Sequence, residues 1–453
     1  MKKLILCLLA LASPAFGYAD QTQPPNVIFI LADDLGYGDL SCYGQTKFET
    51  PNIDALAARG MRFMQHYSGS TVCAPSRCSL LTGLHTGHTP VKGNAEYEPE
   101  GQMPMPADTF TVGHFLQSAG YETGLFGKWG LGYPGSVSDP MKMGFDRFYG
   151  YNCQRLAHCY YPAFLWNDDE RELLWGNVAS HTYDYAPDFI HRQALDFIRS
   201  NKEQPFFCYY AAIQPHADMI APEAYMKKFR GKLLPETSYP DDYYIGQAEP
   251  HAAFAAMVTV LDDYVGEIVA ELDTLGIADS TLVIFSSDNG PHEEGGHDPK
   301  YFDSNGVMRG IKRDLYEGGV RVPMIATWPG KIKAGSQSDH VSAFWDFLPT
   351  MADLTATPLD HEVDGVSMLP TLLGKSGQKE HEYLYWEFPA QGGREAIRKG
   401  DWKAVRYNTN KKPNAPPELF DLSTDVEETT NVAATHPEIV QELSELMSQA
   451  RSD

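Results

Sequence analysis

The chain has 453 residues, of which 43% are hydrophobic and 21% charged, and this ordinary globular composition excludes a disordered or fibrous protein. Lys and Arg number 36 against 60 Asp and Glu, which gives a formal net charge of −24. Such an acidic protein does not hold nucleic acid or an anionic membrane through its overall field, so any anion it binds requires locally concentrated positive charge.

The first 19 residues have the pattern of a secretory signal peptide. Lys2 and Lys3 precede an apolar run over 4–12, and small residues between 15 and 19 suit cleavage. The run is too short to span a bilayer, and no later segment approaches that length. We therefore expect a periplasmic or secreted protein without a membrane span, with a buried first helix as the alternative.

Strand-like and helix-like segments alternate over most of the chain, which predicts an α/β fold with a large, mainly parallel sheet sandwiched by helices. The uninterrupted apolar run over 27–31 indicates a strand buried on both faces. Helices are predicted over 52–59, 111–119 and 252–275, the last with its apolar residues on one face, and a second buried strand over 282–285.

The pattern changes after about residue 355. Short strand candidates at 383–386, 396–399, 402–407 and 419–422 are separated by turn residues, and a final amphipathic helix begins at Thr435. We expect a large first domain over 20–355 and a small C-terminal subdomain over 356–453, built from an antiparallel sheet with one helix.

Polar side chains follow the predicted strands. They are Asp33-Asp34, Lys128, Gln214-Pro215-His216 and Asp288-Asn289. Ligands of open α/β sheets bind at the carboxyl ends of strands, so we expect these groups to converge. Three carboxylates and an amide oxygen suit Ca²⁺ or Mg²⁺. The alternative for each pair is an ordinary turn or helix-capping residue.

A second group surrounds Cys73. Pro75 suits a first helical turn and Gly83 a helix end, so Cys73 is predicted at a helix N-terminus. The helix dipole, free amides and Arg77 there favour an anion. An ordinary thiolate nucleophile and a structural cysteine are both open alternatives. Six cysteines follow the signal, and pairing among Cys42, Cys78, Cys153 and Cys159 is open.

The run Cys73-x-Pro75-Ser76-Arg77 with Leu81-Thr82-Gly83 resembles the signature of type I, formylglycine-dependent, arylsulfatase-like sulfatases of the alkaline phosphatase superfamily. Further matches occur in the expected order at Asn26–Asp34, Gly36-Tyr37-Gly38-Asp39, Gly120-Tyr121-x-Thr123-Gly124, Gly127-Lys128-Trp129, Pro215-His216, Ser287-Asp288-Asn289-Gly290, Lys312, Glu317-Gly318-Gly319-x-Arg321-Val322-Pro323 and Glu418–Leu422. The resemblance covers nearly the whole chain after the signal.

The resemblance implies that Cys73 is oxidised to formylglycine by a formylglycine-generating or anaerobic sulfatase-maturing enzyme. It implies a metal ion, Ca²⁺ with Mg²⁺ as the alternative, held by Asp33, Asp34, Asp288, Asn289 and the modified residue 73. It also places Arg77, Lys128, Lys312 and His216 around the sulfate. A hydroxyl of the hydrated aldehyde would attack sulfur, and His216 or Lys312 would protonate the leaving alcohol. Taken alone, His216 is an ordinary turn histidine and Lys312 a solvated lysine.

One position departs from the family pattern. Gly-Lys-Trp is normally followed by a histidine beside the formylglycine, but this chain has Gly130 after Trp129. We hypothesise that His158 enters from a loop and replaces it; the alternative is a substrate-contacting or surface histidine.

The sequence says less about the substrate. Tyr160, Tyr161 and Trp166 could stack on a sugar, or could be core residues, and Arg155, His292 and His297 could contact its polar groups. We expect exo-action on a sulfated carbohydrate, a galactose or N-acetylgalactosamine sulfate in a glycan. A phosphate or phosphonate monoester hydrolase of the same superfamily and a non-catalytic sulfated-glycan-binding protein are the alternatives.

Overall fold

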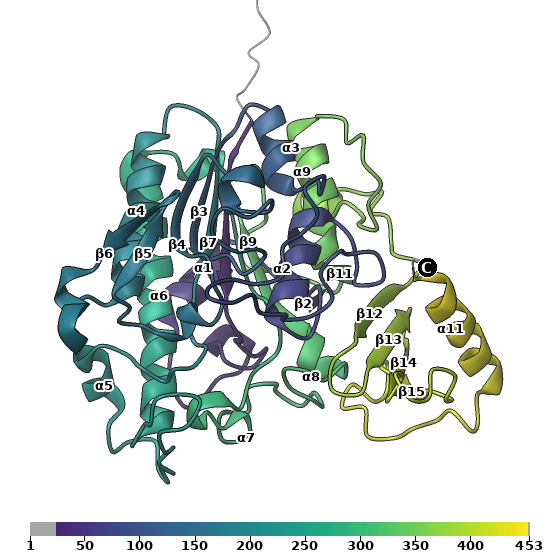
Figure 1. Cartoon of the computed structure of the whole chain (residues 1–453). Helices are drawn as coiled ribbons and strands as arrows, with labels where there is room; N and C mark the ends of the chain where they lie inside the picture. Colours follow the sequence, from purple (N-terminus) through teal and green to yellow (C-terminus); the bar gives the residue numbers. More distant parts are fainter. Residues whose placement is uncertain (1–23, 452–453) are drawn as a thin grey trace, which may run out of the picture.

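The computed structural model of the chain describes residues 24–451, so the predicted signal peptide over 1–19 lies outside the described residues (Figure 1). One large mixed sheet and one small antiparallel sheet make up the fold, as predicted. The large sheet has the order β10 (Ser336–Ser338), β2 (Met61–Tyr67), β9 (Arg321–Thr327), β8 (Thr281–Ser287), β1 (Asn26–Ala32), β7 (Phe206–Ala211), β3 (Glu122–Lys128), β4 (Arg147–Tyr151), β5 (Phe164–Asn167), β6 (Glu170–Leu173), and β11 (Ser342–Ala343) also pairs with β2.

The centre of this sheet is parallel. Strands β8, β1, β7, β3 and β4 run in the same direction, whereas β9 and β5 join them antiparallel. The carboxyl ends of the parallel strands therefore meet at one edge of the sheet, where the polar residues were expected to converge.

Two helical layers cover the two faces of the sheet. One contains α1 (Pro51–Arg59), α4 (Ala186–Ser200), α5 (Glu223–Phe229) and α6 (Pro250–Leu275), and the other α2 (Cys73–Thr82), α3 (Val112–Ser118) and α9 (Phe347–Thr355). Short helices α7 (Pro299–Phe302), α8 (Glu317–Val320) and α10 (Leu369–Leu372) lie in the connections. The predicted helices over 52–59, 111–119 and 252–275 match α1, α3 and α6 to within two residues at each end.

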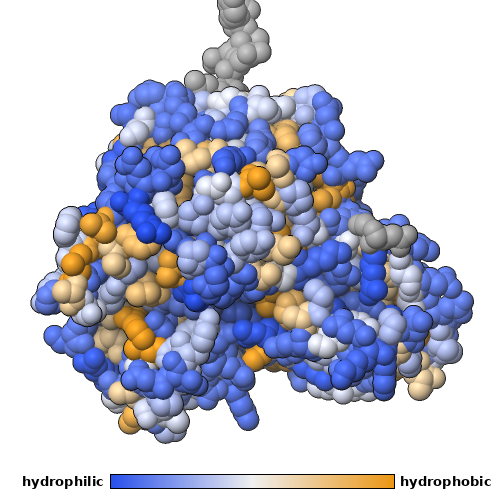
Figure 2. All heavy atoms as spheres, viewed as in Figure 1, coloured by the Kyte–Doolittle hydropathy of each residue, from blue (hydrophilic) through white to orange (hydrophobic). Residues whose placement is uncertain are grey.

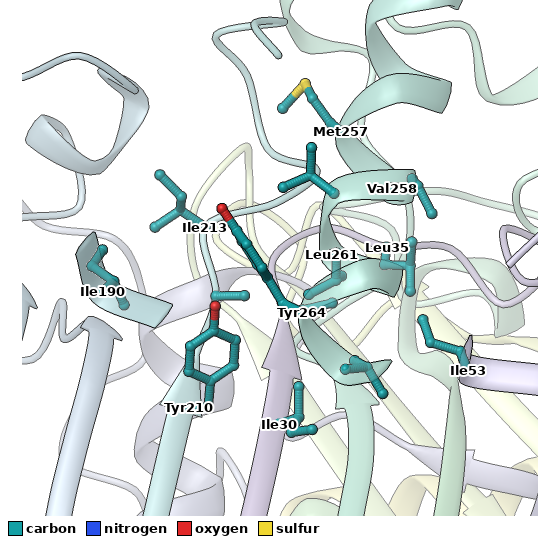
Figure 3. Packing of buried hydrophobic residues seen from close by; sticks show 14 of the residues in the cluster. Ile30, Leu35, Ile53, Ile190, Tyr210, Ile213, Met257, Val258, Leu261 and Tyr264 are labelled. Carbon is teal, nitrogen blue, oxygen red and sulfur yellow. The ribbon is translucent and has the colours of Figure 1, made fainter. Parts of the chain in front are cut away.

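The alternation of side chains along β1 explains this sandwich. Ile28 and Ile30 enter the core under α6, whereas Val27 and Phe29 enter the core under α2 and α9. Figure 3 shows Ile30 beneath Leu261 and Tyr264 of α6. Because each such side chain stabilises the fold by about 1.5–3 kcal/mol when buried, β1 holds both layers together.

Helix α6 differs from its prediction in one respect. Its apolar residues were expected on one face, but every residue from 250 to 262 is buried. The helix lies on the sheet, and Glu236, Tyr301 and Phe302 from neighbouring segments contact its first half, so this half is closed to water.

The C-terminal part forms the separate small sheet on the right of Figure 1. Strands β12 (Leu384–Phe388), β13 (Arg394–Lys399), β14 (Trp402–Tyr407) and β15 (Glu418–Asp421) pair antiparallel in chain order, and α11 (Pro437–Gln449) covers one face. The other face packs Trp386 and Phe420 against Tyr67 and Trp345 of the large unit. The four predicted strands and the final helix are confirmed.

The six cysteines of the described chain are all free thiols, so none of the open pairings is formed. Within residues 24–451 no helix is both long and apolar enough to cross a membrane. The face seen in Figure 2 is mainly hydrophilic, with apolar side chains in small separate patches.

Candidate active site

Four acidic or amide side chains meet at the carboxyl edge of the sheet. Ala32 of β1 pairs in register with Ser287 of β8, so Asp33-Asp34 and Asp288-Asn289 leave adjacent strands at the same level. The Asp34 amide donates to Asp288 Oδ1 at 3.0 Å, and Asn289 Nδ2 donates to Asp34 Oδ1 at 2.7 Å. All four side chains are buried.

This group fits a hard divalent cation. Asn289 Oδ1 is buried without a hydrogen-bond partner in the described chain. Burial, together with the charge on Asp33, raises the pKa of Asp288 to about 7, whereas the charges of Lys128 and Lys312 hold the pKa values of Asp33 and Asp34 below their usual range. Carboxylate and amide oxygens are the ligands of Ca²⁺ and Mg²⁺.

Cys73 is the first residue of α2 and lies next to the carboxylates of Asp33 and Asp34. Its Sγ is 3.4 Å from Asp33 Oδ1 and 3.9 Å from Asp34 Oδ1. Gly83 ends the helix in the left-handed conformation, with φ 73°, as the sequence predicted. Burial raises the pKa of the Cys73 thiol well above its usual value, so the unmodified residue stays protonated at neutral pH. This disfavours the ordinary thiolate alternative.

Three buried cations surround Cys73 and the carboxylates. Lys128 Nζ lies 2.6 Å from Asp33 Oδ2, and Lys312 Nζ lies 2.7 Å from Asp34 Oδ2. Arg77 donates to Asp288 Oδ2 from Nη2 at 2.8 Å and from Nε at 3.0 Å. The positive charge that an acidic protein needs to hold an anion is therefore concentrated here.

Lys312 and His216 form a hydrogen-bonded pair. Lys312 Nζ is 3.1 Å from His216 Nε2, while His216 Nδ1 is 2.6 Å from the Ala217 carbonyl oxygen. His216 therefore donates from Nδ1 and accepts at Nε2. Burial and the Lys312 charge lower the pKa of His216 to about 4, so Lys312 carries the proton of this pair.

A cavity of about 360 Å³ opens onto the pair. Its walls are Asn94, Glu96, Gln102, Gln154, Arg155, His158, His216, Tyr243, Tyr244, Glu294, Lys312 and Arg313. The His158 ring stacks on the His216 ring with centroids 4.6 Å apart and planes 13° apart. The loop histidine thus enters the cavity beside His216, and its replacement of the missing histidine next to residue 73 stays a prediction.

Three predicted substrate contacts do not line this cavity. Tyr160 is fully buried and donates to the carbonyl oxygens of Ile213 and His216, so it supports the His216 turn and has no face for a sugar. His292 is buried with Nε2 3.2 Å from the Pro215 carbonyl oxygen, and His297 stacks on Phe254 in the core. Tyr161 and Trp166 also lie outside the cavity walls.

Arg155 lines the cavity and lies 3.5 Å from Glu98, and its contact with the substrate stays a prediction. The sequence interpretation missed Glu294, Arg313, Tyr243, Tyr244, Asn94 and Gln154. Proximity to Asn289 and Lys312 in the sequence could have indicated Glu294 and Arg313, whereas the tyrosines lie in a loop without any motif.

Two family models cover the chain. The model for the sulfatase family matches residues 25–357, and a model described as N-sulphoglucosamine sulphohydrolase, C-terminal, matches residues 310–453. This chain belongs to the sulfatase family. It is accordingly a sulfuric ester hydrolase, and a metal ion and formylglycine are general features of its family.

Curated relatives and solved structures agree with this assignment. Human arylsulfatase A is 34% identical over 491 residues, covering 97% of this chain and 89% of its own length. An N-acetylgalactosamine-6-O-sulfatase of Bacteroides thetaiotaomicron is 31% identical, covering 95% of this chain and 94% of its own. A solved sulfatase described with glycosaminoglycan metabolism in Bacteroides thetaiotaomicron has a TM-score of 0.79 and 28% identity, covering 94% of this chain and 99% of that one.

Proposed function

We propose that this sulfatase removes a sulfate group from a terminal sugar of a glycan, with galactose or N-acetylgalactosamine sulfate as the substrate. The observation that carries the proposal is the position of Cys73, between the acidic strand ends and the cations Lys128 and Lys312. A nucleophile formed there is next to charges that can hold a sulfate ester.

Each part of the site has a role in this proposal. Asp33, Asp34, Asp288 and Asn289 would hold Ca²⁺, with Mg²⁺ as the alternative, and the ion would supply positive charge to the sulfate. Residue 73, oxidised by a sulfatase-maturing or formylglycine-generating enzyme, would supply an aldehyde hydrate as the nucleophile.

The remaining side chains position and protonate the substrate. Arg77 donates to the Asp288 carboxylate and, at 2.8 Å, to the Lys128 carbonyl oxygen, so it orients both residues within the site. Lys128 pairs with Asp33 and Lys312 with Asp34, and both cations would bind the sulfate. Lys312, which holds a proton 3.1 Å from His216, would donate it to the leaving alcohol.

The size and lining of the cavity support a single sugar as the bound unit. A volume of about 360 Å³ is at the small end of ligand pockets. Amides and charges of both signs line it, which suits sugar hydroxyls beside a sulfate. The N-acetylgalactosamine-6-O-sulfatase that matches over most of both chains supports the same substrate class. The signal pattern over 1–19 supports action in the periplasm or outside the cell.

The test is sulfate release from a panel of defined monosulfated sugars, using protein in which the mass of the Cys73 peptide shows complete modification. We expect release from galactose or N-acetylgalactosamine sulfate, loss with Cys73→Ala, and loss on chelation that added Ca²⁺ restores. Fully modified protein that releases no sulfate would indicate a binding protein instead. Faster cleavage of an aryl phosphate than of the matched aryl sulfate would favour the phosphate or phosphonate hydrolase.

A further inference from the structure

Lys312 and its neighbour Arg313 converge on one carboxylate. Lys312 Nζ lies 3.0 Å from Glu294 Oε2, and Arg313 Nη2 lies 2.5 Å from Glu294 Oε1. The backbone turns sharply between them, because Arg313 has φ 78°. This left-handed conformation is unfavourable for a residue with a side chain, so surrounding contacts must hold it.

The large unit holds one side of this turn. The Arg313 amide donates to the Thr71 carbonyl oxygen at 2.9 Å, and Thr71 Oγ1 donates to the Asp314 carbonyl oxygen at 2.6 Å. Since Thr71 precedes Cys73 by two residues, the turn is tied to the start of α2.

The C-terminal sheet holds the other side. Arg394 of β13 donates to the Arg313 carbonyl oxygen and lies 3.3 Å from Asp314 Oδ1. The Tyr407 hydroxyl of β14 donates to Asp314 Oδ1 and accepts from the Leu315 amide, both at 3.2 Å. The Arg394 guanidinium lies over the Tyr407 ring, 4.6 Å from its centroid. Residues 313–315 are thus bound by two side chains of a subdomain that supplies none of the cavity walls.

We propose that Arg394 and Tyr407 are positioning residues that set Lys312 in the active site by fixing the strained turn at Arg313. This inference rests on the proposed function, since Lys312 matters only if the site binds a sulfate. It gives the C-terminal sheet a part in the reaction without any contact with the substrate.

Other contacts attach the subdomain to the large unit. Its attachment can therefore be tested separately from the positioning of Lys312. Lys403 forms a buried ion pair with Glu317 at 2.9 Å, and Glu317 accepts from the Tyr67 hydroxyl at 2.7 Å. The Tyr316 hydroxyl donates to Glu418 at 2.9 Å across the same junction, next to α8 in Figure 1. The Tyr316 hydroxyl is therefore a matched control, because it joins the two units without bonding to residues 312–315.

The experiment compares Tyr407→Phe with Tyr316→Phe, and Arg394→Ala with Arg394→Lys, by the inhibition constant of inorganic sulfate, by kcat and KM, and by Tm. We expect Tyr407→Phe and Arg394→Ala to weaken sulfate binding about tenfold, the effect of losing one or two positioning hydrogen bonds. Arg394→Lys should recover part of the affinity, and Tyr316→Phe should leave it unchanged while shifting Tm as Tyr407→Phe does.

Equal sulfate inhibition in both tyrosine variants, with turnover intact in the unaltered enzyme, would overturn the inference. If the unaltered, fully modified enzyme neither binds sulfate nor releases it, the proposed function fails instead.

Discussion

The side chain of Gln154 packs directly against Gly130 beside the cavity, so a Cβ atom on Gly130 would lie only 2.5 Å from Gln154 Cγ. Gly130 also has φ 75°, the left-handed region that favours glycine. The family histidine at this position is therefore not simply missing, because the side chain of Gln154 occupies the space that it would need.

Gly130→Ala should destabilise the protein. The left-handed backbone alone costs about 1–2 kcal/mol with a side chain, and the contact with Gln154 adds to it. Denaturant unfolding of Gly130→Ala, Gln154→Ala and the double variant measures both parts. The double variant should recover stability relative to Gly130→Ala; strictly additive losses would show that the two side chains do not compete.

His158→Ala should lower turnover at saturating substrate. The ring stacks on His216, and the His158 carbonyl oxygen accepts from the Asp218 amide at 3.1 Å, so backbone contacts survive the substitution. If His158 replaces the missing histidine as a proton acceptor, kcat should fall by about a hundredfold, typical for loss of a general base. Exposed His181 offers a control, since His181→Ala should leave kcat unchanged. Unaltered turnover in His158→Ala would remove the hypothesis.

Tyr243 is better placed than Tyr160 for the sugar stacking that the sequence predicted for Tyr160. It lines the cavity while 64% exposed, so its ring is free to stack on a sugar. Tyr243→Ala should raise KM for a sugar sulfate about fivefold, the value of one aromatic contact, and Tyr243→Phe should not. An unchanged KM in the alanine variant would place the sugar elsewhere.

His66 should make the fold sensitive to acid. It is buried on β2, with Nδ1 2.9 Å from Ser342 Oγ, and burial lowers its pKa to about 3 from 6.5. Below pH 6.5 the unfolded chain binds a proton at this residue while the folded chain does not, so stability falls as the pH falls.

Between pH 6.5 and about pH 4, His66 should account for a loss of about 3 kcal/mol in the free energy of unfolding. His66→Gln should lose correspondingly less over this range, whereas His181→Gln, at an exposed site, should follow the unaltered protein. Parallel curves for His66→Gln and the unaltered protein would contradict the assignment.

The sequence predicted those elements whose conformation is determined by residues close to them in the chain. The apolar run over 27–31 and the Gly83 helix end need no knowledge of the rest of the chain. The acidic pairs after β1 and β8 could be placed together because parallel strands share an edge. Motif order then identified Arg77, Lys128, His216 and Lys312.

The cavity walls could not be predicted in the same way. Tyr160 and Tyr161 are adjacent aromatic residues in a loop, and only the packed structure shows that Tyr160 supports the His216 turn from below. Tyr243 and Gln154 lie in connections whose paths depend on tertiary contacts. One such contact is the hydrogen bond that the backbone N–H of Gln154 donates to Gln102 Oε1 at 2.7 Å. From the sequence it is visible that Gly130 stands where the family has histidine, but not that the Gln154 side chain occupies the space of that histidine.

The central position of β1 has a consequence for how the molecule is made. Asn26 begins the strand, yet its partner Thr281 on β8 lies 255 positions later. During synthesis from the N-terminus, the pairing of β1 with β8 must therefore wait for more than half of the polypeptide, and such distant pairing is slow. Until that pairing forms, the Asp288 and Asn289 side chains cannot lie beside residue 73 and the two aspartates that follow β1.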